Sequence, residues 1–291
     1  MNLRKIGQRA AFAAFGAGAL ISSATAVMAQ GMGHAEPGEI DFQAPVTSIA
    51  REIQDLHFGI LLMITAITLF VLGLLVVVIW KFNERANPTP SRTTHHTGLE
   101  VAWTVVPILI LVVMAIPSFR LLTHELVIPK ADITMKAVGK QWAWSYEYPK
   151  SENGGFDFIS SMVPEKQLKP GDLRLLTVDN EAVVPVNKTI ALQVTADPSG
   201  VIHSFVIQSF GIRVDAVPGR LNETWFKAER EGVYYGQCSK ICGKDHAFMP
   251  IVFRVVSEDA YKQWLVDAKK KFASVAPADS FAANDSADAV R

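Results

Sequence analysis

The sequence predicts a hairpin of two transmembrane helices followed by an all-β domain that is exported from the cytoplasm. Two uncharged apolar stretches, residues 58–80 and 101–119, are each long enough to cross a bilayer. From about residue 131 to 256, apolar and polar residues alternate in short runs separated by turn residues, which is typical of a β-sandwich or small barrel. The composition agrees, because 49% hydrophobic residues is high for a water-soluble protein, and 28 basic against 28 acidic residues exclude a general nucleic-acid binder.

The N-terminal residues 1–29 predict a cleaved secretory signal peptide. A basic start at residues 4–9 precedes an apolar core made mostly of Ala, Gly and Phe, which ends in VMA at 27–29, with a small side chain where signal peptidase cuts. An uncleaved N-terminal anchor is the alternative. Residues 30–55 are then an extracytoplasmic segment, and its first part, residues 30–50, is expected to be loosely ordered.

The transmembrane hairpin is expected at residues 56–124. At about 1.5 Å per residue, the first apolar stretch crosses the hydrocarbon layer with some tilt. The second stretch is just long enough; Pro107 and Pro117 inside it predict a kink, and Trp103 near one end suits the membrane interface. Basic residues gather between the two stretches, which places that loop in the cytoplasm and both mature ends outside: Lys81, Arg85 and Arg92.

The exported domain is expected at residues 130–270. Apolar residues alternate most clearly in residues 190–194 and 251–255. Ser257 is expected to cap one closing helix, because the apolar residues after it recur at helical spacing: Tyr261, Trp264, Leu265 and Ala268. Residues 271–291 are rich in Ala, Asp, Ser and Asn and are expected to form a disordered tail.

The stretch CSKICGKDHAFM at 238–249 contains both cysteines of the chain. In an exported domain a disulfide is the usual interpretation. However, Cys238, Cys242, His246 and Met249 together offer two thiolates, an imidazole and a thioether, which is a donor set that suits copper. His203, at the edge of an expected strand, offers a second imidazole. Two thiolates can bridge two copper ions, and a main-chain carbonyl between the cysteines can supply the remaining weak donor.

Four motifs make the family recognisable: LEVAWTVVP at 99–107, QWAWSYEY at 141–148, DAVPGRLN at 215–222 and the run from YYGQC at 234–238 to Pro250. The chain resembles subunit II of the aa3-type haem-copper cytochrome c oxidases, bacterial and mitochondrial. The resemblance covers about residues 50–268. It implies two membrane helices and an exported cupredoxin-like domain, a Greek-key β-sandwich or barrel that holds a dinuclear copper A centre with two copper ions.

The resemblance also implies the ligands of that centre. The main-chain oxygen of Lys240 falls at the position that completes the set. Most relatives carry Glu there, whose carboxylate reaches a magnesium ion at the subunit boundary; a protonated ammonium cannot ligate a metal, which argues against this magnesium contact. The side-chain ligands are expected to be His203, Cys238, Cys242, His246 and Met249.

Further roles follow from the resemblance alone. Trp142 matches the exposed tryptophan through which electrons from cytochrome c are accepted; the alternative is a strand aromatic packed in the core. Glu147, Glu152 and Asp197 are candidates for a surface that docks the lysine-rich rim of cytochrome c, with solvated carboxylates as the alternative. Glu100 matches the entrance of a proton channel in the neighbouring catalytic subunit.

The implied function is that of an electron-transfer subunit. It accepts electrons from cytochrome c and passes them to haem in catalytic subunit I, which carries haem a, haem a3 and copper B and couples reduction of dioxygen to proton pumping. This chain is expected to have no oxygen-reducing site of its own. Subunit III is a further expected partner. The implied location is the bacterial inner membrane, with the copper domain on the periplasmic side.

Three other classes of protein fit less well. A membrane-anchored copper chaperone with a thioredoxin-like fold would need a helix after the cysteines, where the sequence predicts a strand. Metal-free quinol-oxidase subunits lack the two cysteines. Nitrous oxide reductase shares the copper motif, but this chain is too short for its catalytic propeller and has membrane spans.

Overall fold

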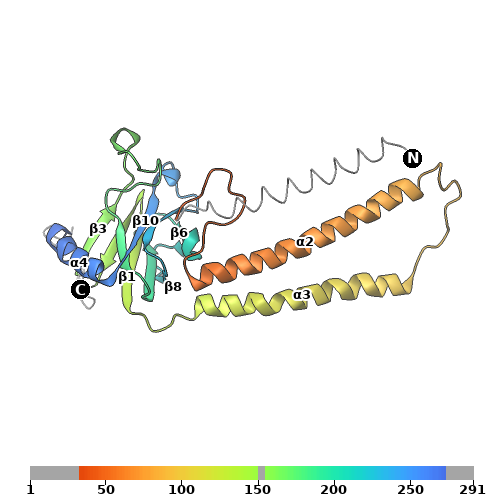
Figure 1. The fold of residues 1–291 in the computed structure, drawn as a ribbon, viewed down its shortest axis with the longest axis horizontal. Coiled ribbons are helices and arrows are strands. Elements are labelled where there is room, and N and C mark those ends of the chain that lie inside the picture. The colour runs from red at the N-terminus through yellow and green to blue at the C-terminus, as the bar shows by residue number, and fades with distance from the viewer. Residues whose placement is uncertain (1–32, 150–154, 273–291) are drawn as a thin grey trace, which may run out of the picture.

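The computed structural model describes residues 33–149 and 155–272 of the chain (Figure 1). Two long helices, α2 (Ser48–Lys81) and α3 (Thr97–Leu126), lie side by side, and the β domain lies at one end of them. The expected signal peptide, Glu152 and almost all of the expected tail lie outside the described residues.

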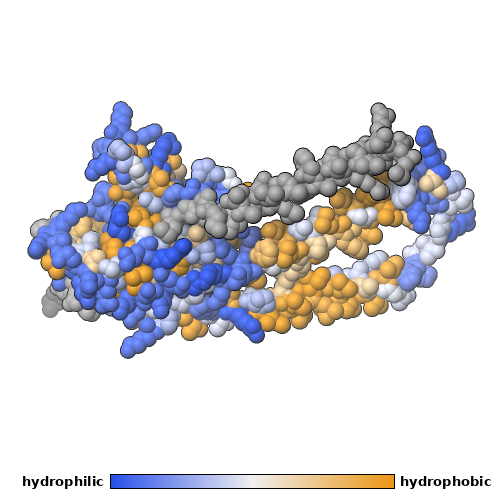
Figure 2. Space-filling model, viewed as in Figure 1, coloured by the Kyte–Doolittle hydropathy of each residue, from blue (hydrophilic) through white to orange (hydrophobic). Residues whose placement is uncertain are grey.

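Both helices contain the predicted spans and extend beyond them. They are the two helices of the described residues that are long and apolar enough to cross a membrane, and apolar side chains dominate the middle of α3 and the visible parts of α2 (Figure 2). α3 continues through Pro107 and Pro117 without ending. α2 begins at an N-cap where Thr47 Oγ1 accepts a hydrogen bond from the Ala50 backbone N–H at 3.0 Å. The first turn of α2 packs against the β domain, since Ile49 and Ala50 are buried and Thr47 Oγ1 donates to the Phe210 carbonyl at 2.8 Å.

The predicted β-sandwich is confirmed. One five-stranded sheet has the order β3-β2-β1-β5-β8 and the other β4-β10-β9-β6-β7. β1 pairs with β5 in parallel, β10 pairs with β4 in parallel, and the remaining pairs are antiparallel. The strands are β1 (Ile133–Lys140), β2 (Ala143–Tyr148), β3 (Phe156–Ser160), β4 (Ala182–Pro185), β5 (Ile190–Ala196), β6 (His203–Ile207), β7 (Ile212–Ala216), β8 (Asn222–Phe226), β9 (Gly232–Cys238) and β10 (Pro250–Val256).

The core between the sheets is rich in aromatic side chains. Trp144 and Tyr146 from one sheet pack edge-on against Phe205 and Phe253 from the other. Each buried phenylalanine of this kind stabilises the fold by about 1.5–3 kcal/mol relative to an exposed one. Tyr148 also joins the sheets, because its hydroxyl donates to the Val183 carbonyl at 2.9 Å and accepts from the Val183 N–H at 3.0 Å.

The closing helix is present as predicted. α4 (Glu258–Phe272) follows β10, and Ser257 Oγ accepts a hydrogen bond from the Ala260 N–H at 3.3 Å. One face of α4 is buried through Tyr261, Leu265 and Ala268. The helix lies at the end of the domain away from the hairpin (Figure 1).

The expectation that residues 30–50 are loosely ordered is wrong for the part that the structure describes. Val46 is buried, and its N–H donates to the Ser209 carbonyl at 2.9 Å. Gly33 lies so close to β9 that a Cβ there would stand 2.0 Å from the Val233 carbonyl oxygen, and its own carbonyl accepts from the Tyr235 N–H at 2.8 Å. The segment is fixed mainly by backbone hydrogen bonds, which leave no periodic signal in the sequence.

The helices and the β domain are joined by polar contacts. The Arg51 guanidinium donates two hydrogen bonds to the Glu229 carboxylate, at 2.7 and 2.8 Å. Glu52 of α2 lies 2.9 Å from His124 of α3, and the Trp225 indole of β8 donates to the His124 carbonyl at 3.1 Å. The hairpin is thus held against one side of the sandwich.

Candidate metal centre

The predicted ligands come from two neighbouring strands and one loop. β9 ends at Cys238 and β10 begins at Pro250, and the loop between them carries the other ligands of the cysteine stretch. His203 is the first residue of β6, and β6 pairs with β9 so that Phe205 lies opposite Cys238. This register brings the distant histidine beside the loop.

The five side-chain donors form one continuous chain of contacts. The Nδ1 atom of His203 lies 3.9 Å from Cys238 Sγ, which lies 3.8 Å from Cys242 Sγ. Cys242 Sγ in turn lies 3.4 Å from His246 Nδ1 and 3.6 Å from Met249 Sδ. Each cysteine sulfur therefore has an imidazole of its own beside it.

The two cysteines are free thiols separated by much more than the ~2.05 Å of a disulfide bond. Cys238, Cys242, Met249 and His203 are all buried. Burial, followed by the neighbouring Cys238 thiol, raises the pKa of Cys242 to about 12. The metal-free thiol thus keeps its proton at neutral pH, and a bound metal ion would displace it.

The surroundings of His203 favour the neutral imidazole that a metal requires. Burial, followed by the charge of His246, lowers the pKa of His203, which favours the neutral imidazole. Gly139 of β1 leaves the space for this ring, because a Cβ there would lie 2.8 Å from His203 Cδ2. Donor atoms of His203, Cys238 and Cys242 all lie within 4.8 Å of one another. Thiolates, imidazoles and a thioether in this arrangement fit copper.

The backbone and the side chain of Lys240 make different contacts at the candidate metal centre. Its carbonyl oxygen lies 3.3 Å from Cys238 Sγ. Its ammonium lies 2.9 Å from the Asp215 carboxylate, and this hydrogen bond lowers the pKa of Asp215. The carbonyl is thus available beside the thiol, whereas the side chain is paired with a carboxylate. The residues present do not fit a magnesium contact from this position.

Trp142 lies next to the centre rather than in the core. It follows β1 in the turn before β2, is partly buried, and donates its indole N–H to the Cys242 carbonyl at 3.1 Å. A Cβ on Gly243 would stand 2.6 Å from its ring atom Cζ2. The core aromatic of this motif is Trp144, which is fully buried and donates to the Met249 carbonyl at 3.3 Å.

The candidate docking acids differ in position. Asp197 directly follows the last residue of β5, at the end of the strand that is close to the candidate metal centre. Its N–H donates to the Gly139 carbonyl at 2.9 Å. Its carboxylate accepts hydrogen bonds from the Ser199 backbone and hydroxyl, which lower its pKa. Glu147 lies farther along β2, about 17 Å from Trp142 at strand spacing, and pairs with Lys136 at 3.0 Å.

Glu100 is remote from the centre. It lies in the first turn of α3, at the end of the hairpin opposite the β domain (Figure 1). At helical rise, about 40 Å of α3 separate it from Leu126. His96 caps this end, accepting a hydrogen bond at Nδ1 from the Leu99 N–H at 3.2 Å.

Sequence reasoning missed several residues that shape the site. Asp215 lies in the DAVPGRLN motif and Gly243 in the cysteine stretch, but neither motif indicates the contacts of these residues, and Gly139 lies outside the quoted motifs. Each of the three acts across the fold. Trp144 is different: it follows Trp142 by two residues, and the alternation of a strand was a usable signal for an inward-facing aromatic.

Comparison with known proteins agrees with this architecture. The family model for the transmembrane domain of cytochrome c oxidase subunit II matches residues 35–121, and the model for its periplasmic domain matches residues 133–256. The chain is 48% identical over 248 residues to probable cytochrome c oxidase subunit 2 of Rickettsia bellii, covering 85% of this chain and 90% of that protein. It is 43% identical over 283 residues to subunit 2 of Cereibacter sphaeroides, covering 90% and 93%.

Among solved structures, the periplasmic domain of cytochrome oxidase subunit II from Bradyrhizobium japonicum is 58% identical, with a TM-score of 0.46, and the match covers 50% of this chain and 99% of that one. Two apolar helices, a β-sandwich with a buried histidine and cysteine cluster, and identities of this size over most of the chain lead to one conclusion. The chain belongs to the cytochrome c oxidase subunit II family, the electron-transfer subunits of haem-copper oxidases with a copper A-type domain.

Proposed function

We propose that this chain holds a dinuclear copper A centre and relays electrons from cytochrome c to haem in the catalytic subunit of an oxidase that reduces dioxygen. When bound, the copper pair would supply a one-electron carrier whose charge is shared over both ions. The proposal depends on one observation: each cysteine thiol has one histidine beside it, His203 beside Cys238 and His246 beside Cys242.

The proposed ligands divide between the two ends of this chain of contacts. His203 and the Lys240 carbonyl lie nearest Cys238, while His246 and Met249 lie nearest Cys242. Both thiolates would help to hold the copper pair. Because every side-chain donor except His246 is buried, ligand movement and exchange with water are restricted.

Trp142 is the proposed point at which electrons enter. Its indole is partly exposed and hydrogen-bonded to the main chain of a proposed ligand. Asp197 is the docking acid best supported by position. Its N–H is hydrogen-bonded to the carbonyl of Gly139, and Gly139 packs against the proposed ligand His203. Glu147 is farther away and already paired with Lys136, which weakens its contribution to steering a basic partner.

The remaining assignments concern the membrane side and the assembly. We propose that residues 1–29 direct export, that the copper domain faces the periplasm from the inner membrane, and that subunits I and III are partners. Glu100, at the far end of α3, is the proposed entrance to the proton channel of subunit I; its exposure at the end opposite the β domain supports that role.

A thioredoxin-like copper chaperone does not fit the described residues. After the cysteine loop, β10 begins at Pro250 and pairs with β9 and β4, so a strand stands where that fold needs a helix. The donor cluster is also buried, whereas a protein that hands copper to a partner needs accessible ligands.

The test is cytochrome c oxidation by the assembled oxidase carrying Cys242→Ser, with Ser239→Ala as the control in the same loop. The Cys242 variant is expected to lose both the copper absorption and cytochrome c oxidation, and to keep dioxygen reduction with a small reductant that reaches haem directly. Retention of the wild-type cytochrome c rate without the copper absorption would contradict the proposal.

A further inference from the structure

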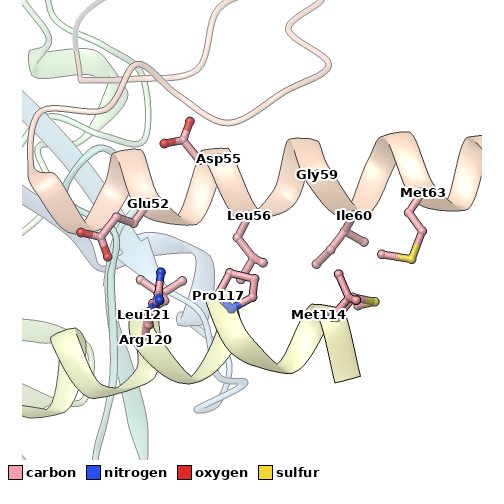
Figure 3. Close-up of a pocket in the computed structure, with 11 residues that line it drawn as sticks. Glu52, Asp55, Leu56, Gly59, Ile60, Met63, Met114, Pro117, Arg120 and Leu121 are labelled. Carbon is pink, nitrogen blue, oxygen red and sulfur yellow. The ribbon is translucent and has the colours of Figure 1, made fainter. Parts of the chain in front are cut away.

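A groove lies between the two membrane helices at their β-domain end (Figure 3). Its volume is about 460 Å³. Gly59 contributes no side chain to it, and an added Cβ there would meet no atom within 4 Å. Farther from the β domain, the groove is lined by apolar side chains from both helices: Leu56, Ile60, Met63, Val113, Met114, Pro117 and Leu121.

The end of the groove nearest the β domain is charged. Arg120 extends from α3 across the gap towards α2, at the same end as Glu52 (Figure 3). Glu52 is held by His124 at 2.9 Å, whereas Asp55, one turn farther along α2, points its carboxylate away from α3 (Figure 3). Among the described residues, Arg120 has no ion pair. An exposed guanidinium directly after the uncharged stretch 101–119 lies at the depth of the lipid headgroups, where a phosphate is its natural partner.

The length of the apolar wall, together with the charged side chain at its end, favours a lipid as the occupant of the groove. From Leu56 to Met63 the apolar wall extends about 10 Å, which suits the upper part of an acyl chain below its headgroup.

We propose that this groove binds one phospholipid with an amine-bearing headgroup, phosphatidylethanolamine being the simplest example. The lipid phosphate pairs with Arg120, the ammonium lies towards Glu52, and one acyl chain lies along Leu56 and Ile60. One charge of each sign, Arg120 and Glu52, lies at the end of the apolar wall. This pair selects a zwitterionic lipid over an anionic one, whose net charge the Glu52 carboxylate would repel.

The bound lipid would fill the space between helices that the chain's own side chains leave open. The groove lies directly beside the contact between Glu52 and His124 that ties α2 to α3. An occupied groove would therefore stabilise the hairpin at the end that carries the β domain. This role is independent of copper and of electron transfer.

The experiment uses the assembled complex, stripped of loose lipid by detergent exchange and then supplied with phosphatidylethanolamine carrying a photoreactive group in one acyl chain. Wild-type protein is expected to be labelled on peptides from residues 56–63 and 113–121. Arg120→Gln is expected to lower the lipid affinity about tenfold or more, because it removes a charge-assisted contact. Arg85→Gln, which removes the same charge from the loop at the other end, is the matched control and is expected to bind as wild type does.

A second variant keeps the test decisive if Arg120→Gln assembles poorly. Gly59→Leu fills the groove without changing charge and is expected to abolish labelling of both helices. The proposal is overturned if both variants are labelled as strongly as wild type, or if phosphatidylglycerol competes better than phosphatidylethanolamine. It is also overturned if labelling is absent in wild type and Ile60→Cys instead cross-links to the catalytic subunit.

Discussion

The indole N–H of Trp142 donates a hydrogen bond to the carbonyl oxygen of Cys242 at 3.1 Å, so a partly exposed ring is linked directly to the main chain of a proposed copper ligand. The two residues are far apart in sequence and meet because the turn between β1 and β2 lies against the cysteine loop. Lys244 lies 5.6 Å above the same ring. A short connection therefore joins the surface to the buried donors.

Trp142→Phe tests this connection. The variant keeps an aromatic ring but loses the hydrogen bond, so we expect about 1 kcal/mol less stability and slower electron uptake from cytochrome c, with the copper absorption unchanged. Rapid-mixing measurements of copper reduction by cytochrome c check the rate, and a small chemical reductant serves as the control. Uptake from cytochrome c at the wild-type rate would show that electrons enter elsewhere.

Gly243→Ala tests how the ring is held. Gly243 has a φ of +128°, and a Cβ there would stand 2.6 Å from Trp142 Cζ2. Gly171 also has a positive φ, of +95°, but open space around it, so Gly171→Ala reports backbone strain alone. We expect Gly243→Ala to be less stable than the Gly171 variant by about 1–3 kcal/mol, in thermal unfolding of the purified protein. Equal effects would mean that the indole does not depend on this contact.

Substitutions of Lys240 distinguish the role of its backbone carbonyl from the role of its side chain. Lys240→Gln is expected to leave the copper absorption unchanged, because the carbonyl remains, and to cost less than about 1 kcal/mol, because the pair with Asp215 is exposed. Lys240→Glu places two carboxylates together and is expected to raise the bound divalent cation measured by metal analysis of the assembled oxidase. Magnesium bound in wild type and lost in the Gln variant would contradict this account.

The pair of Glu229 with Arg51 predicts a dependence on pH. The hydrogen bonds from Arg51 lower the pKa of Glu229 below its ordinary 4.5. The folded protein therefore holds fewer protons than the unfolded one in this range, and the stabilisation is complete above about pH 4.5 and is lost as the pH falls through the lower folded pKa. Both side chains are more than a third exposed, so the contribution is below about 1 kcal/mol.

Glu229→Gln removes this contribution, and Glu231→Gln, an exposed carboxylate two residues away, is its control. Thermal unfolding from about pH 6 to pH 3 is expected to show wild type more stable than the Glu229 variant at the upper end, with the difference shrinking as the pH falls. A difference that grows towards low pH would have the wrong sign for a carboxylate with a lowered pKa.

Much of the architecture was predictable because it is encoded locally. Uncharged stretches of sufficient length identify α2 and α3, alternation identifies the strands, and the cap at Ser257 identifies α4. The segment before α2 was misjudged because Gly33 and Val46 are held by backbone bonds to β9 and Ser209, which depend on a fold already formed.

The site divides in the same way. Spacing within one loop suggested Cys238, Cys242, His246 and Met249, and copper chemistry required a second histidine. The contact of Trp142 with the loop and the pairing of Lys240 with Asp215 depend on how separate strands are placed. The residues that flank Trp142 and Lys240 in the sequence do not predict these contacts.

The most direct test of the central claim is copper analysis and EPR spectroscopy of the full chain, purified alone in detergent and loaded with copper under reducing conditions. The account predicts two copper ions per chain and, after oxidation by one electron, an unpaired electron coupled equally to both nuclei. A single ion, coupling to one nucleus, or a Cys238–Cys242 disulfide in copper-replete, reduced protein would contradict it.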